Sequence, residues 1–255
     1  MSLAQAIILA AGRGERMRPL TDRTPKPLLE VRGKPLLQWH LDALARAGMN
    51  GAAINTAWLG EEIPGKFGGR YELPTVVDAA SAGGHTDGLR LDYSMEGVDF
   101  GGALETAGGI VRALPMLADV FWVVAGDVFA PDFAFTTASA EQFARGGKLA
   151  HLWLVPNPTH HPNGDFGLTV DGLVLSHADV QYTYSTTGLY RKELFAPPYC
   201  DIEPGNPTGV KAALAPILRK AMQDGRISGE LYMGRWADIG TAMRNLSMAR
   251  TASKQ

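Results

Sequence analysis

The chain contains a single cysteine, Cys200, among 255 residues. One cysteine cannot form an internal disulfide, which fits a reducing compartment better than secretion. No histidine adjoins Cys200 in the sequence, so an inert thiol is favoured over a catalytic nucleophile. The N-terminus has no basic segment, and its first apolar run, residues 6–11, is far shorter than the roughly 20 residues of a membrane span. These features predict a cytoplasmic protein that does not enter a membrane.

The chain also lacks an excess of charge of either sign. It has 24 Lys and Arg residues against 26 Asp and Glu residues, for a formal net charge of −2. Without a strongly basic surface, neither nucleic acid nor an anionic membrane is an expected partner. Hydrophobic residues make up 45% of the chain and charged residues 20%, a balance typical of globular proteins. The length fits one domain better than two, and no internal repeats occur.

Apolar runs alternate with helical periodicities along the first half of the chain. Continuous apolar runs, which are typical of strands buried on both faces, occupy residues 5–10 and 120–125. Shorter strands are expected at 52–57 and 89–95, and helices at 35–48 and 104–117. This alternation predicts an α/β fold of the Rossmann-like type, with a mixed, mainly parallel central sheet flanked by helices. Ligands of such sheets bind beyond the carboxyl ends of the strands.

The second half changes character. Strands are expected at 149–155 and 182–190, with a hairpin over 166–176 that turns at Asp171-Gly172. A helix is expected over 210–222, where Pro216 must kink or interrupt it. The remaining expectations are a final helix at 241–252 that Thr241 caps and a mobile surface insertion at 78–88.

A glycine-rich turn follows the first strand. Gly12 and Gly14 would let the backbone approach an anion closely. The turn also carries three cations that can hold phosphate oxygens, Arg13, Arg16 and Arg18. Met17 occupies the place of the third glycine of a dinucleotide fingerprint, and no Gly-Lys-Ser/Thr follows to make a Walker A loop. Taken alone, the segment is also compatible with an ordinary tight turn bearing solvated arginines.

Lys26 lies between Pro25 and Pro27. Each proline fixes its own φ and restricts the residue before it, so the lysine stands on a stiff backbone. A stiff mount suits an ammonium that must meet a phosphate, whereas a solvated lysine gains nothing from it. We therefore expect Lys26 to belong to a phosphate site.

Two aspartates are candidate metal ligands. Asp127 directly follows the apolar strand at 120–125, and Asp238 lies in a short segment far along the chain. Carboxylates that converge from distant segments suit Mg²⁺, a hard ion that keeps some water and shares phosphate oxygens. The alternative is that Asp127 is a turn residue and Asp238 only flanks a helix.

Residues 9–21, LAAGRGERMRPLT, together with Pro25-Lys26-Pro27-Leu28, resemble the signature of the nucleotidyltransferases that act on sugar 1-phosphates. Other stretches resemble one bacterial subgroup, the N-acetylmuramate-1-phosphate uridylyltransferases of peptidoglycan recycling. These stretches are residues 55–60, 104–109, 126–128, 160–166, 228–230 and 236–241. The resemblance covers nearly the whole chain.

The resemblance implies one nucleotidyltransferase domain over 1–255, with a nucleotide-binding half at 1–135 and a sugar-binding half, including a flap, at 136–255. It implies that a sugar 1-phosphate attacks the α-phosphorus of a nucleoside triphosphate, with UTP favoured, and that pyrophosphate leaves. In this scheme Arg16 and Lys26 are catalytic. Arg16 clamps the β- and γ-phosphates, and Lys26 lies between the α-phosphate and the sugar phosphate. Asp127 and Asp238 bind Mg²⁺.

The binding residues that we expect fall into two sets. The nucleotide-binding set is Ala10, Ala11, Gly12, Arg13, Gly14, Glu96, Glu105 and Thr106. The sugar-binding set is Asn157, Asp165, Phe166, Gly167, Thr187, Lys211 and Glu230. Lys211 is equally compatible with a solvated lysine. The adjacent His160 and His161 have no third ligand at metal spacing and are expected to be loop residues. We expect Trp39, Trp58 and Trp153 in the core.

The base and the sugar remain open at this stage. Met95 replaces a proline expected from the subgroup, and residues 98–103 look like an insertion. Guanylyl transfer to mannose 1-phosphate and thymidylyl transfer to glucose 1-phosphate are therefore alternatives. A non-catalytic binder of nucleotide sugars is a third, and it predicts damaged catalytic positions. Arg16, Lys26 and both aspartates are intact, which argues against it.

Overall fold

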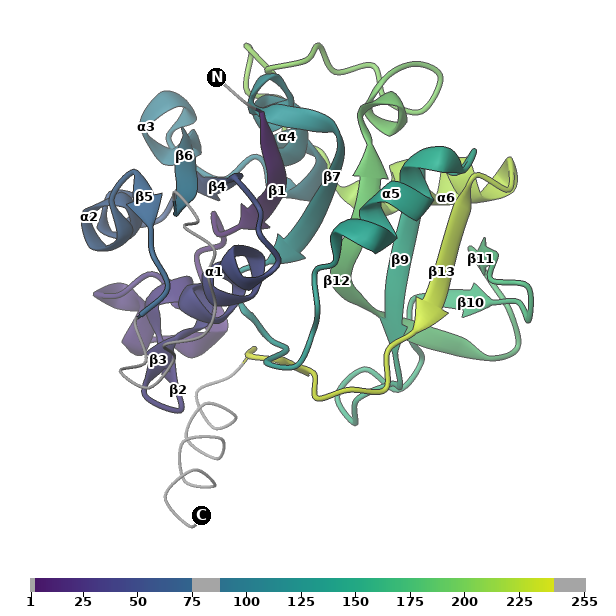
Figure 1. The fold of residues 1–255 in the computed structure, drawn as a ribbon, viewed down its shortest axis with the longest axis horizontal. Coiled ribbons are helices and arrows are strands. Elements are labelled where there is room, and N and C mark those ends of the chain that lie inside the picture. Colours follow the sequence, from purple (N-terminus) through teal and green to yellow (C-terminus); the bar gives the residue numbers. More distant parts are fainter. Residues whose placement is uncertain (1–2, 75–87, 241–255) are drawn as a thin grey trace.

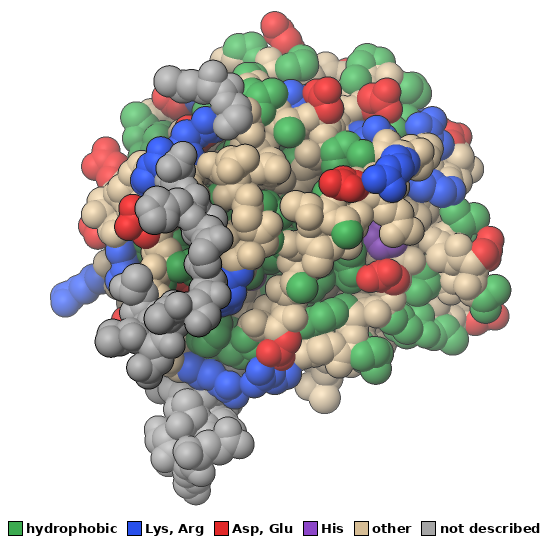
Figure 2. Space-filling model, viewed as in Figure 1, with side chains coloured by type: hydrophobic (Ala, Val, Ile, Leu, Met, Phe, Trp, Pro, Cys, Tyr) green, Lys and Arg blue, Asp and Glu red, His purple; other side chains and the backbone are tan. Residues whose placement is uncertain are grey.

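The computed structural model describes residues 3–74 and 88–240. The predicted helix at 241–252, with Thr241, and all of the predicted insertion except Gly88 lie outside the described residues. Among the helices that are described, none has both the length and the apolar character that crossing a bilayer requires. On the face shown in Figure 2, described acidic and basic side chains are interspersed rather than gathered by sign. This distribution agrees with the small net charge.

The centre of the large sheet is parallel, as the apolar runs predict. β1 (Ala4–Leu9) lies between β4 (Gly51–Thr56) and β7 (Leu117–Ala125), and β6 (Leu89–Met95) continues the sheet beyond β4 (Figure 1). All six residues of β4 are buried. The short β5 (Arg70–Tyr71) closes this edge in the antiparallel sense.

The other side of the sheet is built from later, mainly antiparallel strands. β12 (Gln181–Arg191) pairs antiparallel with both β7 and β9 (Ala150–Val155). β13 (Ile227–Leu231), which the sequence did not predict, runs parallel to β9. The predicted hairpin forms from β10 (Phe166–Leu168) and β11 (Val174–Leu175), next to β12. The sheet is therefore mixed, as predicted.

Helices cover both faces of the sheet, and the alternation of side chains along the strands decides which core each helix enters. Ile7 and Val123 face a core shared with α4 (Glu105–Ala113) and α6 (Leu214–Gln223). Ile8 and Val124 face the opposite core, shared with α1 (Leu36–Arg46) and α5 (Thr137–Arg145). The sequence prediction missed α5.

Two predicted helices have different bounds from those expected. The α-helix predicted over 104–117 ends at Ala113 and is followed by the 3-10 helix Leu114–Met116. The helix predicted from residue 210 begins only at Leu214, so Pro216 lies in its first turn. A first-turn residue needs no intrahelical partner for its N–H, so the proline neither kinks nor interrupts the helix.

The glycines of α4 allow close packing. A Cβ atom at Gly108 would lie 2.5 Å from the Val210 carbonyl oxygen, and one at Gly109 would lie 2.5 Å from Oε1 of Glu96. Glycine is a poor helix former, but here the close approach that it allows offsets this cost. The helix can therefore lie directly against the segments that line the site.

Short elements complete the described chain. They are α2 (Glu62–Phe67), α3 (Glu96–Phe100), the strand pairs β2 (Glu30–Val31) with β3 (Lys34–Pro35) and β8 (Val128–Phe129) with β14 (Ala237–Asp238), and the 3-10 helices Glu15–Met17, Leu20–Asp22, Lys26–Leu28 and Lys192–Phe195. Trp153 is buried as expected and Cys200 is buried too, whereas Trp58 is 36% exposed and not a core residue. Trp39 is partly buried and packs edge-on against Phe129.

Candidate active site

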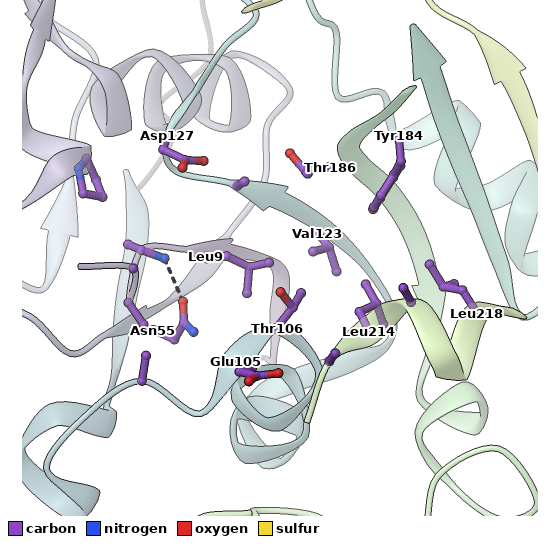
Figure 3. A pocket seen from close by; sticks show the side chains of 18 of the residues that line it. Leu9, Asn55, Glu105, Thr106, Val123, Asp127, Tyr184, Thr186, Leu214 and Leu218 are labelled. Atoms are coloured by element: carbon purple, nitrogen blue, oxygen red, sulfur yellow. Dashed lines mark hydrogen bonds between the residues drawn. The ribbon is translucent and has the colours of Figure 1, made fainter. Parts of the chain in front are cut away.

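A cavity of about 550 Å³ opens at the carboxyl ends of β1 and β7 (Figure 3). We call it the cleft. Its lining is Leu9, Ala10, Ala11, Gly12, Lys26, Pro27, Asn55, Ala103, Glu105, Thr106, Val123, Ala125, Asp127, Asp165, Phe166, Tyr184, Thr186, Ala213, Leu214, Ala215 and Leu218. These residues come from both halves of the chain. The location is the one predicted for a ligand of a parallel sheet.

The glycine turn folds back onto the lysine segment. Gly14 has a left-handed conformation with φ of 67°, and a Cβ atom there would lie 3.1 Å from Cβ of Lys26. The Thr21 hydroxyl donates a hydrogen bond to the Gly14 carbonyl at 2.9 Å. Gly12 has no atom within 4 Å of a Cβ position, so its backbone is open toward the cleft. Gly14 is thus needed for packing, and Gly12 leaves space for a ligand.

The three arginines of the turn do not line the cleft. The Arg13 guanidinium donates to the Thr21 carbonyl and to Asp22, each at 2.8 Å, and lies 3.6 Å from the centre of the Trp58 ring. Arg18 also pairs with Asp22, while Arg16 is exposed on the short helix Glu15–Met17. Arg13 therefore braces the turn, and Arg16 stands outside the cleft lining.

Lys26 and Asp127 meet in the cleft. The Lys26 ammonium lies 2.5 Å from Oδ2 of Asp127, although the two residues are 101 positions apart. Lys26 is 6% exposed, and its charge is therefore held in a site that is largely closed to water. The rigid Pro-Lys-Pro mount and the end of β7 thus share one cavity, as an enzyme site built on these two residues requires.

Asp238 approaches Asp127 because β14 pairs with β8. Asp238 stands opposite Val128, and the Ile239 N–H donates to the Asp127 carbonyl at 3.1 Å. Gly240 leaves room beside the carboxylate, since a Cβ atom there would lie 3.1 Å from Oδ2 of Asp238. The two aspartates therefore stand on adjoining segments, and Asp127 lines the cleft whereas Asp238 does not.

This donor set fits Mg²⁺. The described residues hold no cluster of three or more His, Cys, Asp or Glu side chains that could enclose a metal ion. Two oxygen ligands suit an ion that keeps water and is shared with substrate phosphates. Asp127 and Asp238 are the residues that could hold it.

His40 supports the strand beside these aspartates. It is 2% exposed, on α1, and its Nε2 lies 2.9 Å from the Val128 carbonyl oxygen. Burial lowers the pKa of His40 to about 4. A neutral imidazole can therefore donate to this carbonyl at neutral pH and fix β8. His40 was not among the predicted site residues.

The floor of the cleft is held by a buried hydrogen-bond chain. The Ala10 N–H donates to Oδ1 of Asn55 at 2.8 Å, and the Asn55 amide donates to Glu96 at 2.7 Å. The second Glu96 oxygen accepts from the Leu104 N–H at 2.8 Å. Glu96 is fully buried, and this burial raises its pKa. Glu96 therefore lies beneath the cleft, and Asn55, which was not predicted, lines it.

Glu105 and Thr106 line the cleft from the start of α4. Glu105 adopts a left-handed conformation with φ of 60°, an unusual conformation for a residue with a side chain. Such strain is often retained at functional sites.

The opposite wall contains two of the predicted sugar-binding residues, Asp165 and Phe166, and two residues of β12 that were not predicted, Tyr184 and Thr186. The pairing of β12 with β9 shifts register between Tyr184 and Thr187, and Thr186 has a φ of 61°. This bulge points Thr186 into the cleft and leaves the predicted Thr187 only 2% exposed. A bulge carries no local sequence signal, which explains the displacement by one residue.

The other predicted sugar-binding residues do not line the cleft. Gly167 packs against Ala178, and Lys211 is exposed. Glu230 lies on the α5 face of the sheet, where it accepts a hydrogen bond from Nε1 of Trp153 at 2.6 Å and lines a separate cavity of about 220 Å³. Its position follows from the alternation of side chains along β13.

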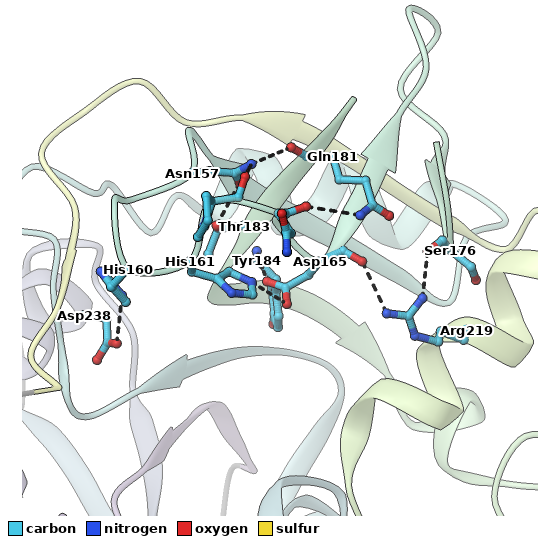
Figure 4. A network of polar contacts seen from close by, with 12 residues as sticks. Asn157, His160, His161, Asp165, Ser176, Gln181, Thr183, Tyr184, Arg219 and Asp238 are labelled. Atoms are coloured by element: carbon cyan, nitrogen blue, oxygen red, sulfur yellow. Dashed lines mark hydrogen bonds and ion pairs between the residues drawn. The ribbon is translucent and has the colours of Figure 1, made fainter. Parts of the chain in front are cut away.

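A polar loop joins the two ends of the site (Figure 4). The Asn157 amide donates to the Gln181 carbonyl at 2.9 Å and to the Pro162 carbonyl at 3.0 Å, so this residue holds the loop instead of a ligand. His160 lies 3.6 Å from Asp238, whereas His161 lies 3.0 Å from Asp165. The adjacent histidines therefore contact opposite ends of the site.

The family model described as Nucleotidyl transferase matches residues 5–254. The N-acetylmuramate alpha-1-phosphate uridylyltransferase of Neisseria meningitidis is 46% identical over 248 residues, which are 94% of each chain. The protein of the same name from Caulobacter vibrioides is 30% identical over 253 residues, covering 95% of this chain and 94% of the relative. A solved structure from Bacillus anthracis that carries the name glucose-1-phosphate thymidylyltransferase superposes with a TM-score of 0.74 at 18% identity, covering 98% of this chain and 96% of that chain. This last likeness shows the fold.

Proposed function

The chain belongs to the nucleotidyl transferase family, and we propose that it transfers the uridylyl group of UTP to N-acetylmuramate 1-phosphate with release of pyrophosphate. The observation that most supports an enzymatic role for this site is the Lys26–Asp127 contact of 2.5 Å inside the cleft. The choice of UTP and N-acetylmuramate 1-phosphate is supported by the names of the two relatives. The cytoplasm, where UTP is available, is the compartment in which we expect the reaction.

The reaction that we propose needs no protein nucleophile. An oxygen of the sugar phosphate attacks the α-phosphorus in line, the bond to the β-phosphate oxygen breaks, and pyrophosphate leaves. The protein contributes by positioning two anions and by reducing their repulsion. Lys26 is the cation of the cleft lining, and we assign it to the space between the α-phosphate and the sugar phosphate. Its burial strengthens this electrostatic effect.

We propose that Asp127 and Asp238 hold Mg²⁺, which would supply positive charge to the phosphate oxygens of the bound nucleotide. His40 keeps β8 in place through the Val128 carbonyl. Arg16, which is exposed on the short helix Glu15–Met17, is proposed to reach the β- and γ-phosphates.

The nucleotide and the sugar would occupy opposite walls. Backbone groups at Ala10–Gly12 and the start of α4 would hold the base and ribose, with Asn55 below them. The sugar would lie against Asp165, Phe166 and Thr186.

The test is a pyrophosphate-release assay that combines each nucleoside triphosphate with a set of sugar 1-phosphates in the presence of Mg²⁺. We expect the highest kcat/KM for UTP with N-acetylmuramate 1-phosphate. A preference for GTP with mannose 1-phosphate, or for dTTP with glucose 1-phosphate, would replace the proposed substrates. Absence of turnover with every pair would overturn the proposed enzyme.

A further inference from the structure

The sugar-side end of the cleft contains a pair of tyrosines that the proposed reaction does not use. The hydroxyl oxygens of Tyr184 and Tyr190 lie 2.6 Å apart. Tyr190 is fully buried and packs against Phe121 and Phe195. Tyr184 is partly exposed and lines the cleft, with its hydroxyl directed into the cavity in Figure 3.

Burial decides which hydroxyl donates. Two tyrosine hydroxyls carry two protons, and one hydrogen bond between them uses only one. Neither hydroxyl forms another hydrogen bond within the described part of the chain. If Tyr184 donated to Tyr190, the Tyr190 proton would be buried without a partner, which is costly. Tyr190 therefore donates to Tyr184, and the Tyr184 proton is available to an acceptor in the cleft.

The surroundings of this proton are apolar. Val123, Leu214 and Leu218 line the same end of the cleft (Figure 3). Phe166 also lines the cleft, and the centre of its ring lies 6.3 Å from that of Tyr184. Tyr184 itself stays protonated because burial raises its pKa. The site thus offers one hydrogen-bond donor among hydrocarbon side chains. A sugar hydroxyl bound here would have a proton of its own that needs an acceptor. An acetyl group has no such proton: its carbonyl oxygen accepts one hydrogen bond, and its methyl group packs against apolar side chains.

We propose that this end of the cleft is the acetamido-binding site of an N-acetylated sugar 1-phosphate, in which the Tyr184 hydroxyl donates to the acetyl carbonyl and Leu214 and Leu218 contact the acetyl methyl group. The inference rests on the proposed function and assigns the residues that recognise the N-acetyl group of its substrate. Tyr190 donates to the Tyr184 oxygen from the core side, and Tyr184 keeps its own proton for the cleft with or without this partner. Asp165 also lines this wall, and its carboxylate is an acceptor for the amide N–H.

The experiment compares two sugars that differ in one substituent. The full chain is assayed with UTP and Mg²⁺ against N-acetylmuramate 1-phosphate and against its analogue with a hydroxyl in place of the acetamido group. The wild-type protein should prefer the acetamido sugar, measured as the ratio of the two kcat/KM values. Tyr184→Phe should lower this ratio about 10-fold, because it removes one hydrogen bond to the acetyl group.

Tyr190→Phe is the matched control. It removes the same atom from the same pair but leaves a donor in the cleft, so the ratio should change by no more than about two-fold. Equal losses of the ratio in the two variants, or an unchanged ratio in Tyr184→Phe, would overturn the proposal. Melting temperatures of both variants report their folding.

A second variant does not touch the tyrosines. Ala215 is exposed on the first turn of α6 and lines the cleft. Ala215→Leu keeps good helix propensity and fills space at this end, so it should lower kcat/KM for the acetamido sugar by about 10-fold more than for the analogue. Equal effects on both sugars would overturn the proposal.

Absence of wild-type turnover with either sugar would count against the proposed function rather than against this site. The two sugars would then be compared by the rise in melting temperature that each causes. Equal rises would overturn the acetamido site, and a larger rise with the N-acetylated sugar that Tyr184→Phe abolishes would support it.

Discussion

The wall of the cleft that comes from residues 3–135 contains Lys26, Asp127 and Glu105 together with backbone groups, whereas the wall from residues 136–240 consists mainly of apolar side chains and hydroxyls, with the carboxylate of Asp165 among them. The first depends on rigid mounts: Gly14 in a left-handed conformation, Lys26 after a proline, and Asp127 at the end of a buried strand. The second depends on the bulge at Thr186 and the start of α6. A phosphate site needs charged groups held at fixed positions, and short local segments can provide these. A sugar site needs a surface that complements the shape of the sugar, and segments far apart in the sequence form that surface together.

The largest effect should come from the charged wall. Lys26→Ala should lower kcat by about 10²–10³-fold, because it removes a buried cation from the path of two phosphates. Lys66→Ala, at an exposed position of α2, should leave the rate unchanged. Pyrophosphate release measures the rates, and the melting temperature checks folding. A normal rate in Lys26→Ala would remove this residue from the mechanism and break the contrast between the walls.

Because His40 is buried, the free energy of unfolding should depend on pH. The pKa of His40 falls from 6.5 to about 4 on folding, so below about pH 6.5 the unfolded chain binds a proton that the folded chain does not. The free energy of unfolding should therefore decrease as the pH falls from 6.5 to 4, by up to about 3 kcal/mol.

Urea unfolding at several pH values measures this dependence. His40→Gln should flatten it, whereas His151→Gln, on the α5 face of the sheet, should remove less of it because His151 is more exposed. An equal slope in wild type and His40→Gln would show that another group causes the acid sensitivity.

Asp238→Asn should weaken the dependence on metal. An amide is a poorer ligand for Mg²⁺ than a carboxylate, so the Mg²⁺ concentration for half-maximal activity should rise on the order of 10-fold. Asp171→Asn, in the exposed hairpin turn of the sugar half, is the control and should not change it. An unchanged Mg²⁺ titration of Asp238→Asn would mean that this aspartate is structural.

Thr186 and Thr187 are neighbours in the sequence, but Thr186 lines the cleft and Thr187 lies in the core. Thr186→Ala should lower kcat/KM for the sugar phosphate by about three-fold to 10-fold with little change in stability, because Thr186 faces the cleft. Thr187→Ala should lower the free energy of unfolding by about 1 kcal/mol and leave the KM of the sugar nearly unchanged, because Thr187 is buried. Substrate titrations and urea unfolding measure the two effects. The opposite pattern would mean that the bulge is not formed in solution.

The smallest effect is expected at Glu230. Glu230→Gln keeps the acceptor for Nε1 of Trp153 and lies on the face away from the cleft, so kcat/KM should change by less than about two-fold. Asp165→Asn, in the cleft lining, is the comparison and should lower it more. A strong loss in Glu230→Gln would restore the sugar-binding role that the sequence predicted.

The charged wall was largely predictable. The apolar runs that became β1 and β7 located the ends where ligands bind, and the Pro-Lys-Pro segment identified the one lysine of the cleft lining. The sugar wall was predicted only in part: Asp165 and Phe166 line the cleft, whereas Gly167, Lys211 and Glu230 do not. Gly167 was predicted from the family resemblance, and Lys211 and Glu230 from residue type. Neither source tells which face of a strand or helix meets the cavity.

The amino-acid sequence by itself determined the features that act within a few residues: buried strands from apolar runs, a stiff lysine from two prolines, and an aspartate after the last apolar residue. Only the tertiary structure decided that Asp238 adjoins Asp127 and that Thr186, not Thr187, enters the cleft. It also decided that the Tyr184 hydroxyl is the one that can donate a hydrogen bond into the cleft. Each of these depends on pairing or packing between segments tens of residues apart. Such contacts depend on the register of the whole sheet, so the local sequence does not predict them.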